Sequence, residues 1–282
     1  MAIIPSSIRQ LSLLLLVLSS TVSLLAPPST ANDSNVLLTG DVLPTNGQLS
    51  NGDATFVMQG DCNLVLYNKG RGFQSGTSGL GDACTLTLDD LGQFVIMVAS
   101  GSAVWSSTLR GNYTREKYAS PRGNYTRGKY AAVLRPDGEV AIYGPAVWST
   151  PNFGFSTARG AVSTQAMEVP MANNVLFSSQ VLYDDAQLTT RDYIFTMRES
   201  CNLALVKRSK GIIWQTGTVD GGENCFLRLD HRGQLAVVDD EYDTVWRSQP
   251  ASKDGDYVLV VQINGQAVVY GPVVWSTASY AY

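Results

Sequence analysis

The sequence has few of the residues that support hydrolytic or metal-dependent catalysis. Its 282 residues include a single histidine, His231, and four cysteines. There is no G-x-S-x-G motif, no H-E-x-x-H motif, and no cysteine or histidine spacing suited to zinc. His231 follows Asp230 in a bend and is expected to be an exposed turn residue. We therefore predict that the protein is not an enzyme.

Adjacent carboxylates are the remaining candidates for a glycosidase site. They occur at Asp89-Asp90, Asp184-Asp185 and Asp239-Asp240. Neighbouring side chains on a strand point to opposite faces of a sheet, so these pairs would not oppose each other across a glycosidic bond.

Charge and long apolar runs are also scarce. The net charge of −4 gives no reason to expect a nucleic acid as a partner, and beyond the N-terminus no run is long and apolar enough to span a membrane. Arg9 precedes an apolar run from Leu11 to Ala26, and small residues follow at Ser29–Ala31. This pattern predicts a secretory signal peptide over residues 1–31 and an extracellular or vacuolar protein. An uncleaved membrane anchor is the alternative.

The chain contains two copies of one half, and each half contains three copies of a smaller unit. Asn35 and Asn174 begin similar segments 139 residues apart. The smaller unit ends in an aromatic residue, a variable residue and a hydroxyl. Its six copies end at Phe73-Gln-Ser75, Trp105-Ser-Ser107, Trp148-Ser-Thr150, Trp214-Gln-Thr216, Trp246-Arg-Ser248 and Trp275-Ser-Thr277. The uninterrupted spacing of 32 residues allows about four short strands. Three such units must pack around a shared centre, which the tryptophans would fill.

The four cysteines follow the same twofold plan. Cys62 and Cys84 occupy places in the first half that Cys201 and Cys225 occupy in the second. The symmetry favours disulfides within each half, Cys62–Cys84 and Cys201–Cys225, in keeping with an exported protein. Four free thiols in a reducing compartment are the alternative, which conflicts with a signal peptide.

Each unit also contains a polar bend between alternating apolar runs, which is typical of a hairpin. The bend residues are Cys62, Gly92, Gly138, Cys201, Gly233 and Gly265. The first bend has the richest chemistry. Its alternate residues are Gln59, Asp61, Asn63, Val65 and Tyr67. A turn near Cys62 would gather a carboxylate, two amides, a phenol and an apolar floor around one small polyol, which indicates a sugar site.

This stretch, Q-x-D-x-N-x-V-x-Y, resembles the mannose-binding signature of the monocot, or bulb-type, lectins, and it matches that signature in full. The six-unit plan extends the resemblance over nearly the whole mature chain, and the two-domain members are the most similar. The resemblance implies an all-β fold of two tandem type II β-prisms, each with three four-stranded antiparallel sheets around a pseudo-threefold axis. A β-propeller or a sandwich is the alternative that the residues alone leave open.

The expected organisation is a lectin domain over residues 32–150, a linker over 151–173 and a second lectin domain over 174–282. The linker is rich in small residues and has no periodicity. In similar lectins such a segment can be cut, which leaves two associated polypeptides. Similar lectins also exchange a C-terminal strand, here expected near Val273 to Thr277, and the two halves could exchange it within one chain.

The resemblance assigns roles to the first bend. Asp61 and Asn63 would hold the axial O2 of mannose, Gln59 would reach O3, Tyr67 would reach O4, and Val65 would pack against the C3–C4 face. None of these contacts needs a metal ion or another cofactor. Mannose-containing glycans and glycoproteins are therefore the expected partners.

The other five bends depart from the signature. The sixth keeps much of it and is expected to form a weaker carbohydrate site. Its residues are Gln262, Asn264, Gln266, Val268 and Tyr270. The second, fourth and fifth bends lack the tyrosine, and the third begins with Arg135 in place of glutamine. These four are expected to be silent toward mannose, although the second domain could take a different ligand, such as a complex N-glycan.

A tandem duplication interrupts the first half between Gly111 and Leu134. It contains two N-x-Thr sequons, at Asn112 and Asn124, which are expected to lie in an exposed and glycosylated loop. The loop is also basic, which is typical of a solvated insertion; a contact with an acidic glycan or a membrane surface is the alternative.

The sequence as a whole predicts a mannose-binding lectin that agglutinates through several sites, with a role in plant defence or storage. Crosslinking needs at least two sites, so a homo-oligomer or a processed hetero-oligomer is expected. A storage or protein-interaction module with mostly silent sugar sites is the alternative.

Overall fold

The computed structural model describes residues 35–70, 72–107, 126–151, 173–248 and 251–280. The predicted signal peptide, the asparagines of both sequons and nearly all of the predicted linker lie outside these ranges. Within them, the only helix is the short 3-10 turn η1 (Thr277–Tyr280). No described helix has the length and apolarity needed to cross a membrane.

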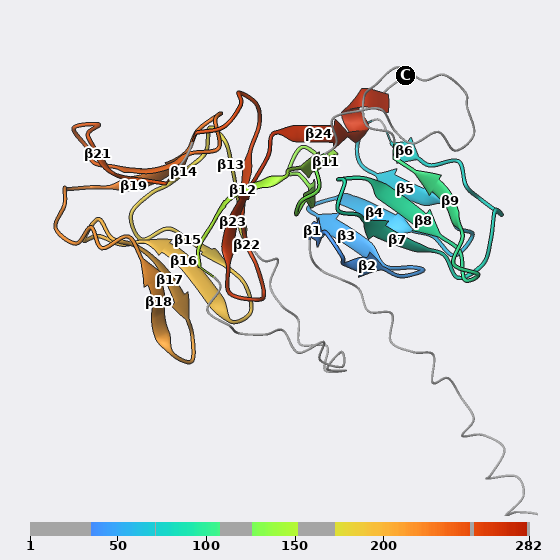
Figure 1. Cartoon of the computed structure of the whole chain (residues 1–282), viewed down its shortest axis with the longest axis horizontal. Helices are drawn as coiled ribbons and strands as arrows, with labels where there is room; N and C mark the ends of the chain where they lie inside the picture. The colour runs from blue at the N-terminus through green and yellow to red at the C-terminus, as the bar shows by residue number, and fades with distance from the viewer. Residues whose placement is uncertain (1–34, 71, 108–125, 152–172, 249–250, 281–282) are drawn as a thin grey trace, which may run out of the picture. The chain divides into compact units, whose positions relative to one another are not determined.

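The described strands form six antiparallel sheets of four strands each (Figure 1). Three sheets make up each of two bodies, which we call the first unit and the second unit. The sheets of the first unit are β3 (Gln48–Asn51), β4 (Ala54–Met58), β5 (Leu64–Tyr67) and β6 (Phe73–Gln74); β2 (Val42–Leu43), β7 (Thr85–Leu88), β8 (Phe94–Met97) and β9 (Ala103–Ser106); and β1 (Val36–Leu38), β10 (Ala131–Leu134), β11 (Val140–Tyr143) and β24 (Val273–Ser276).

The second unit repeats this arrangement. Its sheets are β15 (Gln187–Thr189), β16 (Tyr193–Met197), β17 (Leu203–Lys207) and β18 (Gly211–Gln215); β14 (Val181–Leu182), β19 (Phe226–Leu229), β20 (Leu235–Val238) and β21 (Thr244–Arg247); and β13 (Val175–Phe177), β22 (Val258–Val261), β23 (Ala267–Tyr270) and β12 (Ala146–Ser149). The all-β prediction, with three four-stranded sheets in each half, is confirmed.

The two halves exchange one strand each. β12 closes the first half of the sequence but pairs with β23, with Ser149 opposite Val268. β24 closes the second half but pairs with β11, with Ser276 opposite Ala141. The exchange expected near the C-terminus is therefore present within one chain, and neither folded unit corresponds to one continuous stretch of sequence.

Tryptophans fill the centre of each unit, as predicted. In the second unit Trp148, Trp214 and Trp246 lie with ring centroids 5.9, 6.0 and 6.3 Å apart in edge-to-face contacts. In the first unit Trp275 lies against Phe73 at 5.7 Å, and Trp105 lies 6.2 Å from the same ring. Trp148, from the first half of the sequence, therefore packs in the core of the second unit. Trp275, from the second half, packs in the core of the first unit.

The hydroxyl of the aromatic-x-hydroxyl motif has the same structural role in all six sequence repeats. It accepts a hydrogen bond from the backbone N–H that opens the return strand of a hairpin. The bonds are Leu64 N to Ser75 Oγ (2.9 Å), Phe94 N to Ser107 Oγ (2.8 Å), Val140 N to Thr277 Oγ1 (3.0 Å), Leu203 N to Thr216 Oγ1 (3.1 Å), Leu235 N to Ser248 Oγ (2.9 Å) and Ala267 N to Thr150 Oγ1 (3.1 Å). Two of the six, those of Thr150 and Thr277, join one half of the sequence to the other.

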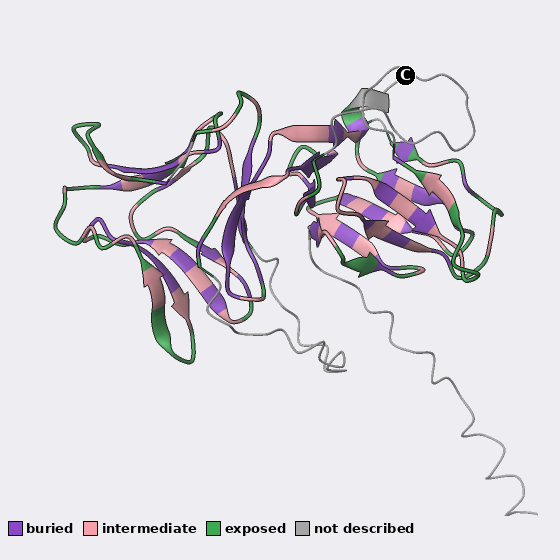
Figure 2. Cartoon of the chain, in the orientation of Figure 1, coloured by how far each residue is buried: buried purple, intermediate pink, exposed green. Residues whose placement is uncertain are grey.

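A third apolar cluster covers the outer faces of two sheets. Its buried members are Val36, Ala131, Val133, Ala141, Tyr143, Val175, Val258, Val260, Val268 and Tyr270. They come from the sheet that contains β10 and β11 and from the sheet that contains β22 and β23. These four strands are buried at every position, whereas β4 alternates between buried and intermediate residues (Figure 2). The third and sixth hairpins therefore share one apolar cluster, to which the other four hairpins contribute no buried residue.

Candidate functional site

The first bend is a tight hairpin between β4 and β5, as the sequence predicts. Met58 pairs with Leu64, and the backbone closes through bonds from Gln59 N to Asn63 O (2.9 Å) and from Cys62 N to Gln59 O (3.0 Å). Cys62 adopts a left-handed conformation with a φ of 71°. The equivalent residues Gly92, Gly138, Cys201, Gly233 and Gly265 have φ values of 77°, 82°, 61°, 70° and 84°. This agreement confirms the alignment of the six bends and explains why glycine occupies four of them.

Disulfides anchor the two bends that lack glycine. Cys62 is bonded to Cys84, and Cys201 is bonded to Cys225. Both predicted pairings are confirmed. The disulfide ties the first bend to the start of β7, so the residues on either side of Cys62 are held against a neighbouring sheet.

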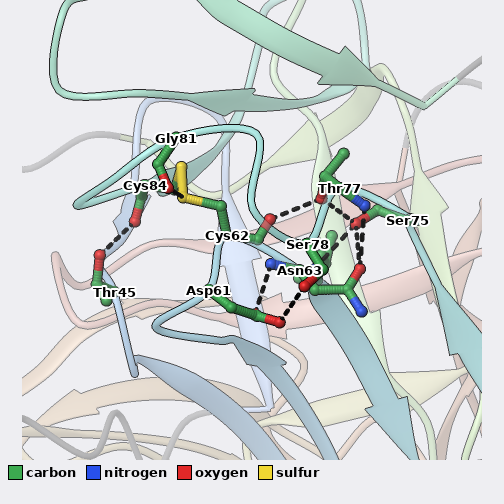
Figure 3. The surroundings of a disulfide bond; sticks show 10 residues. Thr45, Asp61, Cys62, Asn63, Ser75, Thr77, Ser78, Gly81 and Cys84 are labelled. Carbon is green, nitrogen blue, oxygen red and sulfur yellow. Dashed lines mark hydrogen bonds between the residues drawn. A yellow bond between two sulfur atoms is a disulfide. The ribbon is translucent and has the colours of Figure 1, made fainter.

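Asn63 is held rigidly behind the bend (Figure 3). Its Oδ1 accepts hydrogen bonds from Ser75 Oγ (3.1 Å), Gly76 N (3.1 Å) and Thr77 N (3.3 Å). Three donors on one oxygen fix the orientation of the amide, so its Nδ2 group points away from the loop. Among the described residues no acceptor takes a bond from Nδ2, which leaves both of its protons for a ligand.

Asp61 lies beside Asn63 on the exposed side of the bend. Its Oδ1 accepts from Asn63 N (3.0 Å), and its Oδ2 accepts from Ser78 Oγ (2.7 Å). These bonds, with that from Ser78 the strongest, lower the pKa of the Asp61 carboxyl below its ordinary value. An ionised carboxylate can accept about four hydrogen bonds, so two positions remain for sugar hydroxyls.

The rest of the signature lies on the two strands. Gln59 Nε2 donates to Tyr67 Oη at 2.6 Å, which joins the two ends of the site. Tyr67 is 53% exposed. Val65 lies between them and pairs across the sheet with Val57 and Gln74. The structure therefore brings all five predicted residues to one outward-facing hairpin.

Sequence reasoning missed the residues that hold this site in shape. Ser75, Thr77 and Ser78 position Asn63 and Asp61, and Thr77 Oγ1 also donates to Cys62 O at 2.6 Å. The signal was present, since Ser75 is the hydroxyl of the repeating aromatic-x-hydroxyl motif. Only the folded hairpin shows that this motif lies against the bend.

The second and fifth hairpins use their first polar residue differently. Asp89 stands at the place of Gln59, and its Oδ1 accepts from Leu91 N (2.9 Å) and Gln93 N (2.8 Å). Asp230 makes the same pair of bonds to Arg232 N and Gln234 N in the fifth hairpin. These carboxylates brace their own turns, and no phenol stands where Tyr67 stands in the first hairpin.

The sixth hairpin reproduces the first in a buried setting. Gln262 Nε2 donates to Tyr270 Oη at 2.5 Å, the counterpart of the Gln59–Tyr67 bond. Tyr270 is 1% exposed, and burial raises the pKa of its hydroxyl. Gln266 donates instead to Thr150 O on the exchanged strand at 3.3 Å.

At the predicted weaker site, the structure buries Gln262, Gln266, Val268 and Tyr270 and leaves only Asn264 partly exposed. Val268 and Tyr270 face the third apolar cluster instead of solvent. The third hairpin lies in the same cluster through Ala141 and Tyr143, and its Arg135 forms an ion pair with Asp137. Sequence alone could not reveal this, because the covering comes from another sheet.

A serine, a histidine and an aspartate lie close together elsewhere in the second unit. Ser179 Oγ is 2.6 Å from His231 Nε2, and His231 Nδ1 is 3.3 Å from Asp256 Oδ1. Both His231 and Asp256 are more than half exposed. The loops that carry them are joined by Gly255 N to His231 O, as the matching loops of the first unit are joined by Gly128 N to Asp90 O. The cluster of Ser179, His231 and Asp256 therefore reinforces a contact between loops that the first unit makes without a histidine or a serine at the equivalent positions.

No protein-family model matches the chain. Comparison with known proteins nevertheless gives relatives over nearly its full length. A mannose-specific lectin 2 of Crocus vernus is 53% identical over 94% of this chain and 97% of its own length. This chain belongs to the monocot mannose-specific lectin family. A second family member, mannose-specific lectin 2 of Colocasia esculenta, is 43% identical over 95% of this chain and 94% of its own length.

A solved structure matches both units of this lectin together. The two-domain, fetuin-binding agglutinin of Scilla campanulata superimposes with a TM-score of 0.73 and 28% identity, over 86% of this chain and all of that one. The β-prism architecture of the bulb lectins is thereby confirmed for this lectin. As a member of a lectin family it is a carbohydrate-binding protein and not an enzyme. Among the described residues no group of three or more His, Cys, Asp or Glu side chains is placed to hold a metal ion.

Proposed function

We propose that this lectin binds mannose and high-mannose glycans through the hairpin of Gln59, Asp61, Asn63, Val65 and Tyr67. The observation that carries the proposal is the fixed amide of Asn63 beside the braced carboxylate of Asp61. One sugar hydroxyl can accept from Asn63 Nδ2 and donate to Asp61 at the same time, which satisfies both of its hydrogen-bonding roles. The relatives named as mannose-specific support the choice of sugar.

The remaining side chains would orient the ring. Val65 offers an apolar surface to one face of the hexose, and Tyr67 and Gln59 offer polar atoms to the hydroxyls beyond it. Each neutral hydrogen bond is worth about 0.5–1.5 kcal/mol net, and a charged acceptor is worth somewhat more. An open site of this size binds one sugar at about the millimolar level.

Titration with methyl α-mannoside tests the proposal. Wild-type protein should bind the sugar, and Asp61→Ala and Asn63→Ala should abolish binding in proteins that remain folded. Ser200→Ala, at the place of Asp61 in the fourth hairpin, is the matched control and should bind as the wild type does. A storage or protein-interaction module would show no mannose binding in any of these proteins.

Weak single sites make assembly part of the proposed function. Each chain carries one hairpin with the complete signature, and the sixth hairpin, which comes nearest to it, is covered. Agglutination therefore requires at least two chains, so we infer a homo-oligomer, or a hetero-oligomer if the linker is processed. Tethered sites raise avidity by orders of magnitude. A strictly monomeric particle in sedimentation analysis, or failure to agglutinate mannan-bearing cells, would contradict this part.

The proposed location follows from the N-terminus and the disulfides. Export through the secretory pathway to the vacuole or the cell exterior would supply the oxidising conditions that both disulfides require. Such a location also brings the protein into contact with foreign glycans, in keeping with a role in defence or storage. Mass spectrometry of protein from its native tissue should show an N-terminus near residue 32.

A further inference from the structure

The outer face of one sheet in the second unit carries an arrangement that the proposed mannose site does not explain. This sheet consists of β14, β19, β20 and β21 (Figure 1). Arg228 on β19 pairs with Ala236 on β20, and Ala236 pairs with Arg247 on β21. All three side chains therefore lie on one face, with a small alanine between two arginines. Arg228 and Arg247 are exposed.

Three aromatic rings lie at the end of the same sheet. The ring centroids of Tyr183 and Phe226 are 6.2 Å apart, and those of Phe226 and Tyr242 are also 6.2 Å apart. Tyr183 is 66% exposed and Tyr242 is 78% exposed. Phe226 is two residues from Arg228 along β19, so it lies on the same face of the sheet. The arginines and the aromatic rings therefore form one continuous surface.

The equivalent sheet of the first unit provides an internal comparison. Its register is the same, with Thr87 opposite Val95 and Val95 opposite Ser106. Neither arginine has a charged counterpart there. By the alignment of the two halves, Pro44, Thr85 and Gly101 stand where the second unit has Tyr183, Phe226 and Tyr242. Two cations and three rings therefore distinguish one face of two otherwise matching sheets, and the framework does not require them.

The charges of the two arginines are not neutralised by the chain. Over the ranges that the structure describes, no ion pair or side-chain hydrogen bond involves Arg228 or Arg247. Asp230 is bonded to the backbone of its own turn, and Arg232 is paired with Asp254. A guanidinium that has no partner on the protein is well suited to bind an anion from solution.

We propose that this face binds a saccharide that carries a carboxylate or a sulfate group. Arg228 and Arg247 stand about 10 Å apart, because each neighbouring strand adds about 4.8 Å. Their long side chains can converge over the methyl group of Ala236 and hold one anionic group with charge-assisted hydrogen bonds. Phe226 and Tyr183 then offer a stacking surface for the apolar face of the next sugar ring.

The site is separate from the hairpin of Asp61 and Asn63, and the two differ in chemistry. The first site presents a carboxylate, which favours neutral hydroxyls and repels an anionic sugar. The face of Arg228 and Arg247 presents two cations and aromatic rings, with Ala236 and the apolar residues Val181 and Val238 on the same face. One chain would therefore bind two kinds of glycan through its two units.

Surface plasmon resonance with matched pairs of glycans tests the proposal. Immobilised full-length protein is exposed to 3′-sialyllactose and to 6-sulfolactose, with lactose as the neutral counterpart of both. We expect the acidic members to bind at least about tenfold more tightly than lactose, and the preference to weaken as salt is raised. Comparison of the two acidic probes shows whether the anion is a carboxylate or a sulfate.

The first unit supplies the control residues. In the double variant Arg228→Thr and Arg247→Ser, the preference for acidic glycans should disappear while the melting temperature and the affinity for methyl α-mannoside stay unchanged. Phe226→Thr should weaken the binding of lactose and of both acidic sugars by a similar factor. Asp61→Ala should have the opposite pattern, with mannoside binding lost and acidic-glycan binding retained. Equal binding of acidic and neutral glycans by the wild type, or an undiminished preference in the double variant, would overturn the proposal.

Discussion

The first and fourth hairpins are built on the same frame and present different surfaces. Asn202 Oδ1 accepts from Thr216 Oγ1, Gly217 N and Thr218 N, as Asn63 Oδ1 accepts from a hydroxyl and two backbone N–H groups. Each asparagine follows a disulfide-bonded cysteine at a left-handed bend. The frame therefore folds in the same way in both units.

The surfaces differ at each place where the first hairpin would touch a sugar. Ser200 stands for Asp61, and Val219 stands for the serine that braces Asp61. The amide of Asn202 is occupied, because its Nδ2 donates to Gln215 Oε1 at 2.9 Å. Val206 stands for Tyr67. The hydrogen-bonded frame of a hairpin and its recognition surface are therefore separable, so a substitution in one should leave the other intact enough to be measured.

Removal of the disulfides should have the largest effect on stability and should affect the two hairpins alike. Cys62→Gly with Cys84→Ala, and Cys201→Gly with Cys225→Ala, open loops of 22 and 24 residues. Each pair should lower the free energy of unfolding by about 3 kcal/mol, because the unfolded chain regains entropy. Glycine keeps the left-handed bend accessible. Denaturant melts should show similar losses, and calorimetry should show weakened mannose binding only for the first pair.

Asn63→Ala and Asn202→Ala should separate folding from binding. Each substitution leaves one hydroxyl and two backbone N–H groups without their acceptor, at a cost of about 1–3 kcal/mol in stability. Only Asn63→Ala also removes a free donor from the surface, so only this variant should lose mannose. Loss of mannose binding in Asn202→Ala would show that the fourth hairpin takes part in binding.

Asp61→Asn should weaken mannose binding by about tenfold, because a neutral amide replaces a charged acceptor. Protonation of Asp61 in the wild type at low pH should weaken mannose binding in the same way. The pKa of Asp61 lies below its ordinary value, so the carboxylate stays ionised as the pH falls through the usual range of aspartate. Binding measured by calorimetry should be flat from neutral pH to about pH 4 and should fall only below that. A decline centred near pH 6 would implicate another group.

Tyr67→Phe and Tyr270→Phe should have the smallest effects, and these effects should be of different kinds. The first removes an exposed hydroxyl bonded to Gln59 and should weaken mannose binding by roughly two- to tenfold. The second leaves the buried amide of Gln262 without its partner and should cost about 1–3 kcal/mol of stability without any change in binding. A change in mannose affinity for Tyr270→Phe would show that the sixth hairpin opens in solution.

The sequence predicted the elements of this fold well because its signals are local. Glycine or cysteine marked every bend, and the aromatic-x-hydroxyl motif marked the end of every repeat. Burial of the sixth hairpin could not be predicted, since Val268 and Tyr270 are covered by residues distant in sequence. The role of Ser78 was also out of reach, because a single exposed serine in a loop has no distinctive pattern.

The candidate site was predictable in its ligand-facing residues and not in its supports. Gln59, Asp61 and Tyr67 belong to a pattern that can be read along two strands. The hydrogen bonds that fix Asn63 depend on the approach of another loop, which alternation does not encode. The face of Arg228 and Arg247 was missed for the same reason, because the two residues become neighbours only when β19 and β21 flank β20.

The exchange of β12 and β24 has a consequence for biosynthesis and for cleavage. The first core lacks Trp275 until β24 has been synthesised, so the first unit cannot close before the second half of the chain is made. A fragment that ends after Ser149 would carry β12 without the sheet it completes. Conversely, a protease cut between β12 and β13 would leave two polypeptides interlocked through their terminal strands, and they would part only on unfolding.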